Sequence, residues 1–225
     1  MTITLYGAAV SPFVRKVRVV LAEKSLAYNY EPVSPFSPPP GFTDISPLKR
    51  IPVLRDDSEG PDATLPDSSA ICAYLERKHP SPALYPSQPF AYGRALWFEE
   101  YADSDFIAAS GGGIFRPIVL NRLMRKEPDQ ALANDTWEQK VPRFLEYFEK
   151  ELGSRAHYVG DKFSIADIAI ASPFVNLAHA GFAPDPARYP NLVRFLKTMH
   201  ARPSFATSIA EECKMLAPLG VKYAG

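Results

Sequence analysis

Two short segments of the sequence carry polar side chains at predicted helix starts. Ser11 is followed by Pro12, and Asp67 is followed by Ser68, each just before a helical pattern of apolar residues. The first N–H groups of a helix have no partner inside the helix, and the helix dipole is positive at that end. Such a start can hold a negatively charged group. The ordinary alternative is that these side chains only cap their helices.

Cysteine and histidine content argues against two other kinds of chemistry. The chain has two cysteines, Cys72 and Cys213, and four scattered histidines. These are too few for a disulfide framework or a zinc site, so we expect no metal. Cys72 lies among apolar residues on a predicted helix, which indicates a buried and unreactive thiol.

The composition is that of an ordinary globular protein and excludes several classes of partner. Hydrophobic residues make up 46% of the 225 positions, and 25 basic side chains balance 25 acidic ones. With no overall basic field we expect no nucleic-acid partner. No apolar run approaches the roughly 20 residues of a membrane helix. Arg15, Lys16 and Arg18 interrupt the stretch where a signal peptide needs apolar residues, so we expect a cytoplasmic protein without membrane attachment.

The first 80 residues alternate between strand and helix patterns. A cluster of prolines at 32–40 rules out a helix there and indicates a loop. Arg15, Lys16 and Arg18 fall mostly off the apolar stripe of the first helix, and we expect them on a solvated face. The predicted order is β-α-β-loop-β-β-α, with strands at 2–6, 27–33, 51–54 and 63–65 and helices beginning at Ser11 and at Asp67.

Residues 80–89 contain four prolines, and residues 81–89 are the predicted linker between a domain at 1–80 and a second domain at 90–225. The second domain reads as helical throughout. Ser164 and Asp167 form a variant capping box, in which the aspartate stabilises the next helix and has no catalytic role. The predicted helices are 90–109, broken or bent at Gly111–Gly113 and resumed toward Met124, then 135–152, one starting at Ser164, 191–200 and 204–214.

Four motifs in this order resemble those of the cytosolic glutathione transferase family. They are S-P-F-V-R-K-V at 11–17, S-P-L-K-R-I-P-V-L at 46–54, L-P-D-S-S-A-I-C-A-Y-L at 65–75 and Y-V-G-D-K-F-S-I-A-D-I-A-I at 158–170. The resemblance covers essentially the whole chain. It implies an α/β thioredoxin-like N-terminal domain followed by an all-α C-terminal helical domain, the glutathione transferase fold.

The resemblance also implies roles for individual residues in binding glutathione. Ser11 would donate a hydrogen bond to the glutathione sulfur, with Tyr6 as the alternative donor and strand packing as the ordinary reading of that tyrosine. The backbone of Ile51, before a cis Pro52, would pair with the cysteinyl part. The remaining contacts would come from Lys49 to the glycyl carboxylate and from Asp67 and Ser68 to the glutamyl end. Many relatives have glutamate where this chain has the shorter Asp67.

A second, hydrophobic substrate would need an apolar site. The candidates for its lining are Phe13, Phe36, Phe106 and Phe115, each of which could instead be a core residue. The resemblance implies a homodimer that conjugates glutathione thiolate to a hydrophobic electrophile, without a metal or a covalent enzyme intermediate. The alternatives are a glutathione-dependent isomerase, lyase or peroxidase on the same scaffold, and a non-catalytic interaction protein that has kept the fold.

Overall fold

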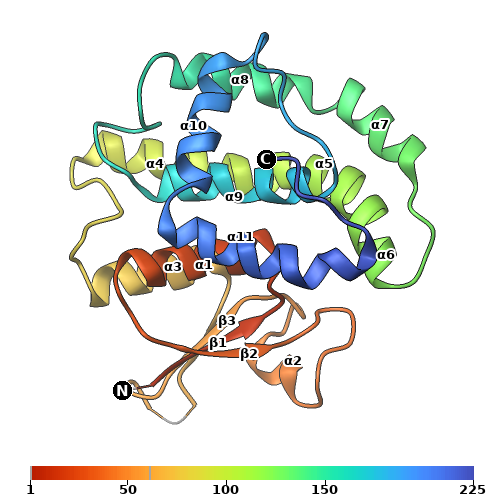
Figure 1. The fold of residues 1–225 in the computed structure, drawn as a ribbon. Helices are drawn as coiled ribbons and strands as arrows, with labels where there is room; N and C mark the ends of the chain where they lie inside the picture. The colour runs from red at the N-terminus through yellow and green to blue at the C-terminus, as the bar shows by residue number, and fades with distance from the viewer. Residues whose placement is uncertain (1, 61) are drawn as a thin grey trace. The chain divides into compact units, whose positions relative to one another are not determined.

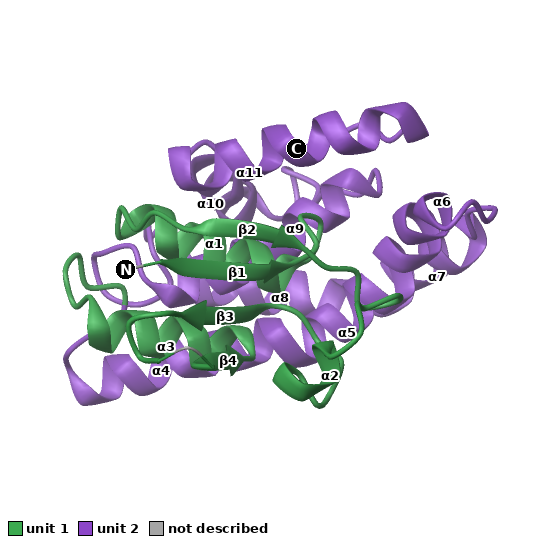
Figure 2. Ribbon diagram, turned by 90° about the horizontal axis from the view of Figure 1, so that it is seen from below, with its two compact units in different colours: residues 1–84 green, residues 85–225 purple. Residues whose placement is uncertain are grey.

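The computed structural model describes residues 2–60 and 62–225. The chain divides into two compact units, residues 1–84 and residues 85–225 (Figure 2). The boundary lies inside the segment 81–89, for which we predicted a linker. Among the described residues, no helix is both long enough and apolar enough to cross a membrane.

The first unit is a four-stranded mixed sheet with two helices on one face (Figure 1). The strand order is β2-β1-β3-β4, in which β1 and β2 are parallel and the other two pairs are antiparallel. This is the α/β architecture that we predicted, with one short helix, α2, that we missed after the proline cluster. The elements are β1 (Ile3–Gly7), α1 (Pro12–Glu23), β2 (Asn29–Pro32), α2 (Phe42–Ile45), β3 (Val53–Asp56), β4 (Thr64–Pro66) and α3 (Ser68–Lys78).

The pairing register brings four strand ends to the same edge of the sheet. Tyr6 near the end of β1 pairs with Val53, the first residue of β3, and Val53 pairs with Pro66, the last residue of β4. Gly7 at the end of β1 lies opposite Pro32 at the end of β2. The chain therefore leaves β1, β2 and β4, and enters β3, at one edge.

Gly7 allows the first helix to pack closely against this edge. A Cβ atom at position 7 would lie 2.4 Å from Cγ2 of Val14, a distance that real contacts do not reach. After the short turn, Ser11 caps α1 and Pro12 takes the first helical position, where its missing N–H costs nothing.

The three cations of α1 are buried, which corrects the solvated face that we expected. Arg15 and Lys16 are fully buried and Arg18 is nearly so. Lys16 donates from Nζ to Ser69 Oγ on α3 at 2.9 Å, and Arg18 donates from Nε to Tyr28 Oη at 2.9 Å. A charged group tolerates burial when hydrogen bonds replace its contacts with water. A helical pattern in the sequence gives the face of the helix to which a side chain is attached, but not where the end of a long side chain lies.

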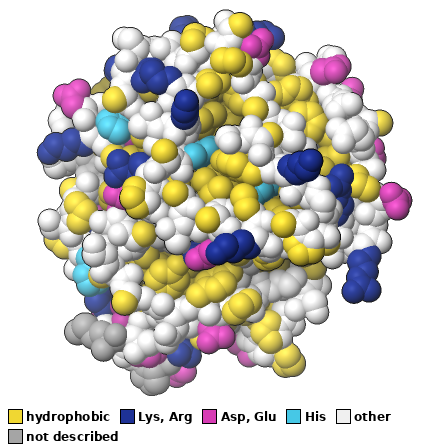
Figure 3. Space-filling view, viewed as in Figure 1, with side chains coloured by type: hydrophobic (Ala, Val, Ile, Leu, Met, Phe, Trp, Pro, Cys, Tyr) yellow, Lys and Arg dark blue, Asp and Glu magenta, His cyan; other side chains and the backbone are white. Residues whose placement is uncertain are grey.

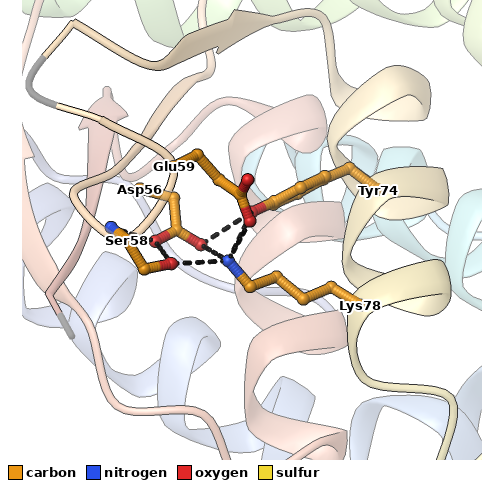
Figure 4. Close-up of polar contacts among 5 residues, drawn as sticks. All are labelled: Asp56, Ser58, Glu59, Tyr74 and Lys78. Atoms are coloured by element: carbon orange, nitrogen blue, oxygen red, sulfur yellow. Dashed lines mark hydrogen bonds and ion pairs between the residues drawn. The ribbon is translucent and has the colours of Figure 1, made fainter.

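An ion-pair network holds the β3–β4 hairpin to the last turn of α3 (Figure 4). Lys78 Nζ lies 2.8 Å from Asp56 Oδ2 and 2.6 Å from Glu59 Oε1. The same ammonium group donates to Ser58 Oγ at 2.6 Å, and Tyr74 donates from its hydroxyl to Asp56 Oδ2 at 2.7 Å. One cation thus joins two elements that are about 20 residues apart in the chain.

This network shifts the pKa of both partners. Burial alone would raise the pKa of Asp56, but hydrogen bonds from Lys78, Ser58 and Tyr74 outweigh it and hold that pKa far below its usual value. Hydrogen bonds to Asp56 and Glu59 raise the pKa of Lys78. A lowered carboxyl pKa stabilises the fold above the unfolded-state value and loses that contribution as the pH falls.

We predict that Lys78→Met lowers the free energy of unfolding by about 1–3 kcal/mol near neutral pH, because it leaves the buried Asp56 carboxylate without its cation. The difference from wild type should shrink below about pH 4, where Asp56 begins to be protonated in the unfolded chain. Urea unfolding across pH measures both effects. Arg55→Met is the control: its pair with Asp57 is exposed, and we expect a loss below about 0.5 kcal/mol. Equal losses in both variants would contradict the role of the network.

The second unit is helical throughout its described elements. Its helices are α4 (Pro89–Tyr101), η1 (Ala102–Phe106), α5 (Ile107–Ser110), η2 (Gly111–Leu120), α6 (Asn121–Leu123), α7 (Gln130–Gln139), α8 (Pro142–Leu152), α9 (Ile165–His179), α10 (Pro190–His200), α11 (Pro203–Leu216) and η3 (Ala217–Leu219). The segments η1 and η2 are π-helical, whereas η3 is a 3-10 turn.

One predicted helix in this unit was wrong. The predicted helix 135–152 is two helices, because α7 ends at Gln139 and Pro142 begins α8 after two intervening residues. At the glycine run 111–113 we expected the helix to be broken or bent, and it is not broken there. The run instead begins the π-helical η2. The residues on either side of η2, Ser110 and Asn121, also have helical backbone angles.

Helix α9 and a cluster of aromatic rings form the core of the second unit. Every residue of α9 is buried, and α9 contacts α4, α5, α10 and both π-helices. The ring of Phe106 lies 4.9–5.5 Å, centroid to centroid, from those of Phe144, Phe148 and Phe174. These rings pack η1 against α8 and α9.

The capping box predicted at the start of α9 is present. Asp167 is fully buried, and its Oδ2 accepts a hydrogen bond from the Ser164 N–H at 2.9 Å. Its Oδ1 accepts from the Tyr158 N–H at 3.0 Å, so the same carboxylate also holds the loop before the helix. Asp167 is a structural residue, because both oxygen atoms satisfy buried backbone groups.

We predict that Asp167→Ala lowers the free energy of unfolding by about 2–4 kcal/mol, because it removes the cap and leaves two buried N–H groups unpaired. Thermal or denaturant unfolding measures the loss. Asp185→Ala is the matched control, since Asp185 also accepts from a backbone N–H but in an exposed turn. A loss at position 167 no larger than at position 185 would contradict this account.

Candidate functional site

The register of the sheet brings together the segments that carry the predicted glutathione-binding residues. Ser11 follows β1, the Ile51–Pro52 bond precedes β3, and Asp67 and Ser68 follow β4. Because β1 and β4 end where β3 begins, all three segments lie at one edge of the sheet in the first unit.

Ser11 is half-buried at the N-terminus of α1. Its Oγ accepts a hydrogen bond from the Val14 N–H at 3.4 Å, a long capping bond. Accepting this bond uses a lone pair of the oxygen, so the hydroxyl proton remains able to donate to another group. A helix N-terminus and a hydroxyl donor together stabilise an anion, including a thiolate.

The peptide bond between Ile51 and Pro52 is cis, as the motif at 46–54 predicts. Pro52 is buried and Ile51 is half-buried. Strand β3 begins at Val53, so the Ile51 backbone lies just outside the strand ladder, at the edge that also holds Ser11.

A hydrogen-bonded turn precedes this cis bond and presents Lys49. Ser46 is buried, and its hydroxyl donates to the Arg50 carbonyl at 2.7 Å and accepts from the Arg50 N–H at 3.0 Å. The Lys49 N–H donates to the Ser46 carbonyl at 2.8 Å. Lys49 itself is exposed and has a φ of 54°, in the left-handed region.

Ser46 stabilises the turn before the cis bond, and our sequence reasoning missed it. The signal was available, because a serine before a proline often bonds to nearby backbone groups in a turn. The sequence alone does not show which backbone groups form hydrogen bonds with the Ser46 hydroxyl. Only the folded turn shows that both bonds go to Arg50, one residue before Ile51.

Asp67 caps α3 in an uncommon backbone conformation. Its φ is 79°, and its Oδ1 accepts from the N–H groups of Ser69 at 2.9 Å and Ala70 at 3.1 Å. Asp67 is exposed, whereas Ser68 is buried. Since both capping bonds use Oδ1, Oδ2 can accept a bond from a ligand. Strained residues of this kind are concentrated at functional sites.

Tyr6 and the four predicted acceptor-site phenylalanines occupy different environments. Tyr6 packs against Val33, Phe42 and Val53, as in ordinary strand packing. The four phenylalanines are not gathered within either unit: Phe13 is half-buried in α1, Phe36 is 57% exposed in the proline loop, and Phe106 and Phe115 are buried in the second unit.

The described residues contain no group of three or more His, Cys, Asp or Glu side chains that could hold a metal ion. Cys72 is fully buried, as we predicted. On the face drawn in Figure 3, Lys and Arg side chains are interspersed with Asp and Glu side chains.

Comparisons with known proteins agree with this fold. Residues 5–83 match the family model for the glutathione S-transferase N-terminal domain, and residues 115–212 match that for the C-terminal domain. A glutathione S-transferase of Triticum aestivum is 31% identical, and the alignment covers 92% of each chain. The FtsZ-localized protein A of Caulobacter vibrioides is 25% identical, over 96% of this chain and 94% of its own.

Solved structures agree as well. A glutathione S-transferase of Methylobacterium radiotolerans, in complex with glutathione sulfonate, is 31% identical, covers 93% of this chain and 95% of its own, and has a TM-score of 0.75. A thioredoxin-like first unit followed by a helical second unit defines the class of protein. The chain belongs to the glutathione transferase family, as its four motifs predicted.

We predict that Ser46→Ala lowers the free energy of unfolding by about 1–2 kcal/mol and loosens the turn before the cis bond, because two hydrogen bonds are lost. Amide hydrogen exchange at Arg50 should become faster by more than the global loss of stability explains. Ser46→Thr keeps the hydroxyl and is the control. Unchanged exchange at Arg50 in the alanine variant would contradict a stabilising role for Ser46 in this turn.

Proposed function

We propose that this chain is an enzyme that conjugates the thiolate of glutathione to a hydrophobic electrophile. The observation that carries the proposal is the meeting of Ser11, the cis Ile51–Pro52 bond and the Asp67–Ser68 helix start at one edge of the sheet. A relative with 31% identity binds glutathione sulfonate in its solved structure, which adds support for the tripeptide as the ligand.

The proposed pose follows the polar groups along this edge. The Ser11 hydroxyl donates to the sulfur, and the backbone of Ile51 pairs with the cysteinyl part. Ser68, at the start of α3, receives the glutamyl carboxylate, while Oδ2 of Asp67 accepts from the ammonium group. Lys49 extends from its turn toward the glycyl carboxylate.

The chemistry needs a thiolate at neutral pH. A free thiol has a pKa near 8.5, and lowering that pKa by about 2 units corresponds to roughly 2.7 kcal/mol. The N-terminus of α1 and the Ser11 hydroxyl both favour the charged form. With an aryl chloride, the thiolate forms a carbon–sulfur bond and the chloride leaves with the electron pair. Holding both reactants together contributes the rest of the rate enhancement.

The acceptor site and the assembly complete the proposal. Phe13 and Phe36 are the proposed acceptor-site residues of the first unit. Phe106 and Phe115 are buried in the second unit, and Phe106 packs among aromatic rings as a core residue, which corrects its assignment to the acceptor site. Family membership supports a homodimer, a cytoplasmic location and a role in detoxification. An isomerase, lyase or peroxidase would use the same thiolate, and a screen of substrates separates these activities.

We expect wild type to bind glutathione and to lower its thiol pKa. Ser11→Ala should still bind glutathione, with the thiol pKa raised relative to wild type and kcat/KM for chlorodinitrobenzene reduced about 10- to 100-fold, since one hydrogen bond to a charged atom is lost. Calorimetry measures binding, and ultraviolet absorbance of the thiolate across pH measures the pKa. Ser11→Thr, which keeps a hydroxyl, is the control.

The outcomes separate the parts of the proposal. No binding by wild type at millimolar glutathione would rule out the enzyme. Binding with the same thiol pKa in wild type and Ser11→Ala would show that another residue donates the hydrogen bond to the sulfur. Tyr6→Phe would then be the next variant to measure.

A second candidate is a non-catalytic interaction protein. It is favoured by the relative named FtsZ-localized protein A, which aligns over almost the full length of this chain. A protein of this kind would not need a sulfur donor. Absence of glutathione binding, together with an intact fold, would favour this candidate.

A further inference from the structure

Two buried lysines connect α1 to opposite ends of α3. Lys16 donates from Nζ to the hydroxyl of Ser69, in the first turn of α3, at 2.9 Å. Lys24, just after α1, donates to the carbonyls of His79 and Pro82, just after α3, at 2.7 and 2.8 Å. The two helices therefore run side by side in the same direction, and both start at the edge of the sheet that holds the predicted glutathione-binding residues.

Lys24 lies where the dipole of α3 favours a cation. Carbonyl groups at the C-terminal end of a helix carry partial negative charge. The side chain of Lys24 is fully buried, and its Nζ also lies 2.7 Å from Oε2 of Glu76. A charge can be buried at low cost when hydrogen bonds and an opposite charge replace its contacts with water. Lys24 is therefore a structural cation that holds this end of α3 to α1.

Lys16 lies at the other end of α3, where the helix dipole disfavours a cation. It is fully buried, and its partner Ser69 is the second residue of the helix. A buried charge is poorly screened, so this ammonium group adds to the positive potential that the free N–H groups already create. The arrangement becomes favourable when negative charge lies at the start of α3, and it strengthens the binding of an anion there.

Ser69 couples Lys16 to the two residues that we assigned to the glutamyl end of glutathione. Its hydroxyl accepts from Lys16, and its N–H donates to Oδ1 of Asp67 at 2.9 Å. Asp67 has a φ of 79°, a conformation that persists only where neighbouring contacts hold it. Ser68 is buried between these two residues in sequence. The contact from α1 to Ser69 therefore holds the first turn of α3 in place.

We propose that Lys16 is a positioning residue for the glutamyl carboxylate of glutathione. The inference rests on the proposed function, because it takes Ser68 as the residue that receives this carboxylate. Lys16 acts through Ser69: it fixes the first turn of α3 and places a buried positive charge next to that turn. Its contribution depends on the negative charge of the ligand's carboxylate, which a purely structural lysine would not require.

The test compares two ligands by calorimetry on the full chain. One is S-methylglutathione, in which the methyl group removes the thiol as a variable, and the other is the same compound with the glutamyl α-carboxylate replaced by an amide. Lys16→Met removes the charge and keeps an apolar stem. It should weaken the binding of S-methylglutathione about 10-fold and leave that of the amide within about 2-fold of wild type. Lys16→Arg restores the charge and should bind S-methylglutathione within about 3-fold of wild type.

Lys24→Met is the matched control, because it also removes a buried lysine that joins α1 to α3. It should change the affinities for the two ligands by the same factor. Ser69→Ala keeps Lys16 but removes its contact, and it covers the case in which Lys16→Met does not fold. We expect Ser69→Ala to bind S-methylglutathione about 3-fold more weakly or worse, with the amide again within about 2-fold.

The outcomes separate this inference from the proposed function. Equal losses for both ligands in Lys16→Met, or in Ser69→Ala if the first variant does not fold, would overturn the role of Lys16 and leave the proposed function intact. No binding of S-methylglutathione by wild type at millimolar concentration would overturn both.

Discussion

The pairing of β1 with β3 and of β3 with β4 decides where the predicted glutathione-binding residues lie. Tyr6, Val53 and Pro66 form one row across the sheet, and the segments just beyond that row carry Ser11 and Asp67. A shift of one residue in either pairing would turn each strand's buried side chains to the opposite face. Burial of one face of the sheet therefore fixes the register strongly, and the positions of these residues depend on that register.

Around this edge the backbone takes conformations that non-glycine residues rarely adopt. Lys49 and Asp67 both have positive φ, and each is held by hydrogen bonds close in sequence. Ser46 secures the turn that carries Lys49, while the side chain of Asp67 secures the start of α3. Backbone strain of this kind persists only where contacts with the surrounding structure hold the residue in place. Here the strained residues are Lys49 and Asp67, whose polar side chains lie at the same edge of the sheet.

The second unit is built around one fully buried helix, α9. Helix α9 has no solvated face, so it needs apolar neighbours on all sides and a satisfied N-terminus. Aromatic rings on η1 and α8 supply part of the packing. At the N-terminus of the helix, the Asp167 carboxylate accepts a hydrogen bond from the Ser164 N–H. Segment η2 packs against α7 at Gly113, where a Cβ atom would lie 2.6 Å from Oγ1 of Thr136.

Features set by neighbours in sequence could be predicted from the sequence alone. The helix starts at Ser11, Asp67 and Ser164 follow from capping chemistry, which involves three or four adjacent residues. The order of strands and helices along the first 80 residues came from residue patterns, and the cis bond before Pro52 came from a motif shared with the family. Features that depend on distant partners needed the tertiary structure. The burial of Lys16, the ring packing of Phe106 and the unpaired hydroxyl of Thr136 each arise from segments far apart in the chain, and a local pattern contains no information about which surface will cover it.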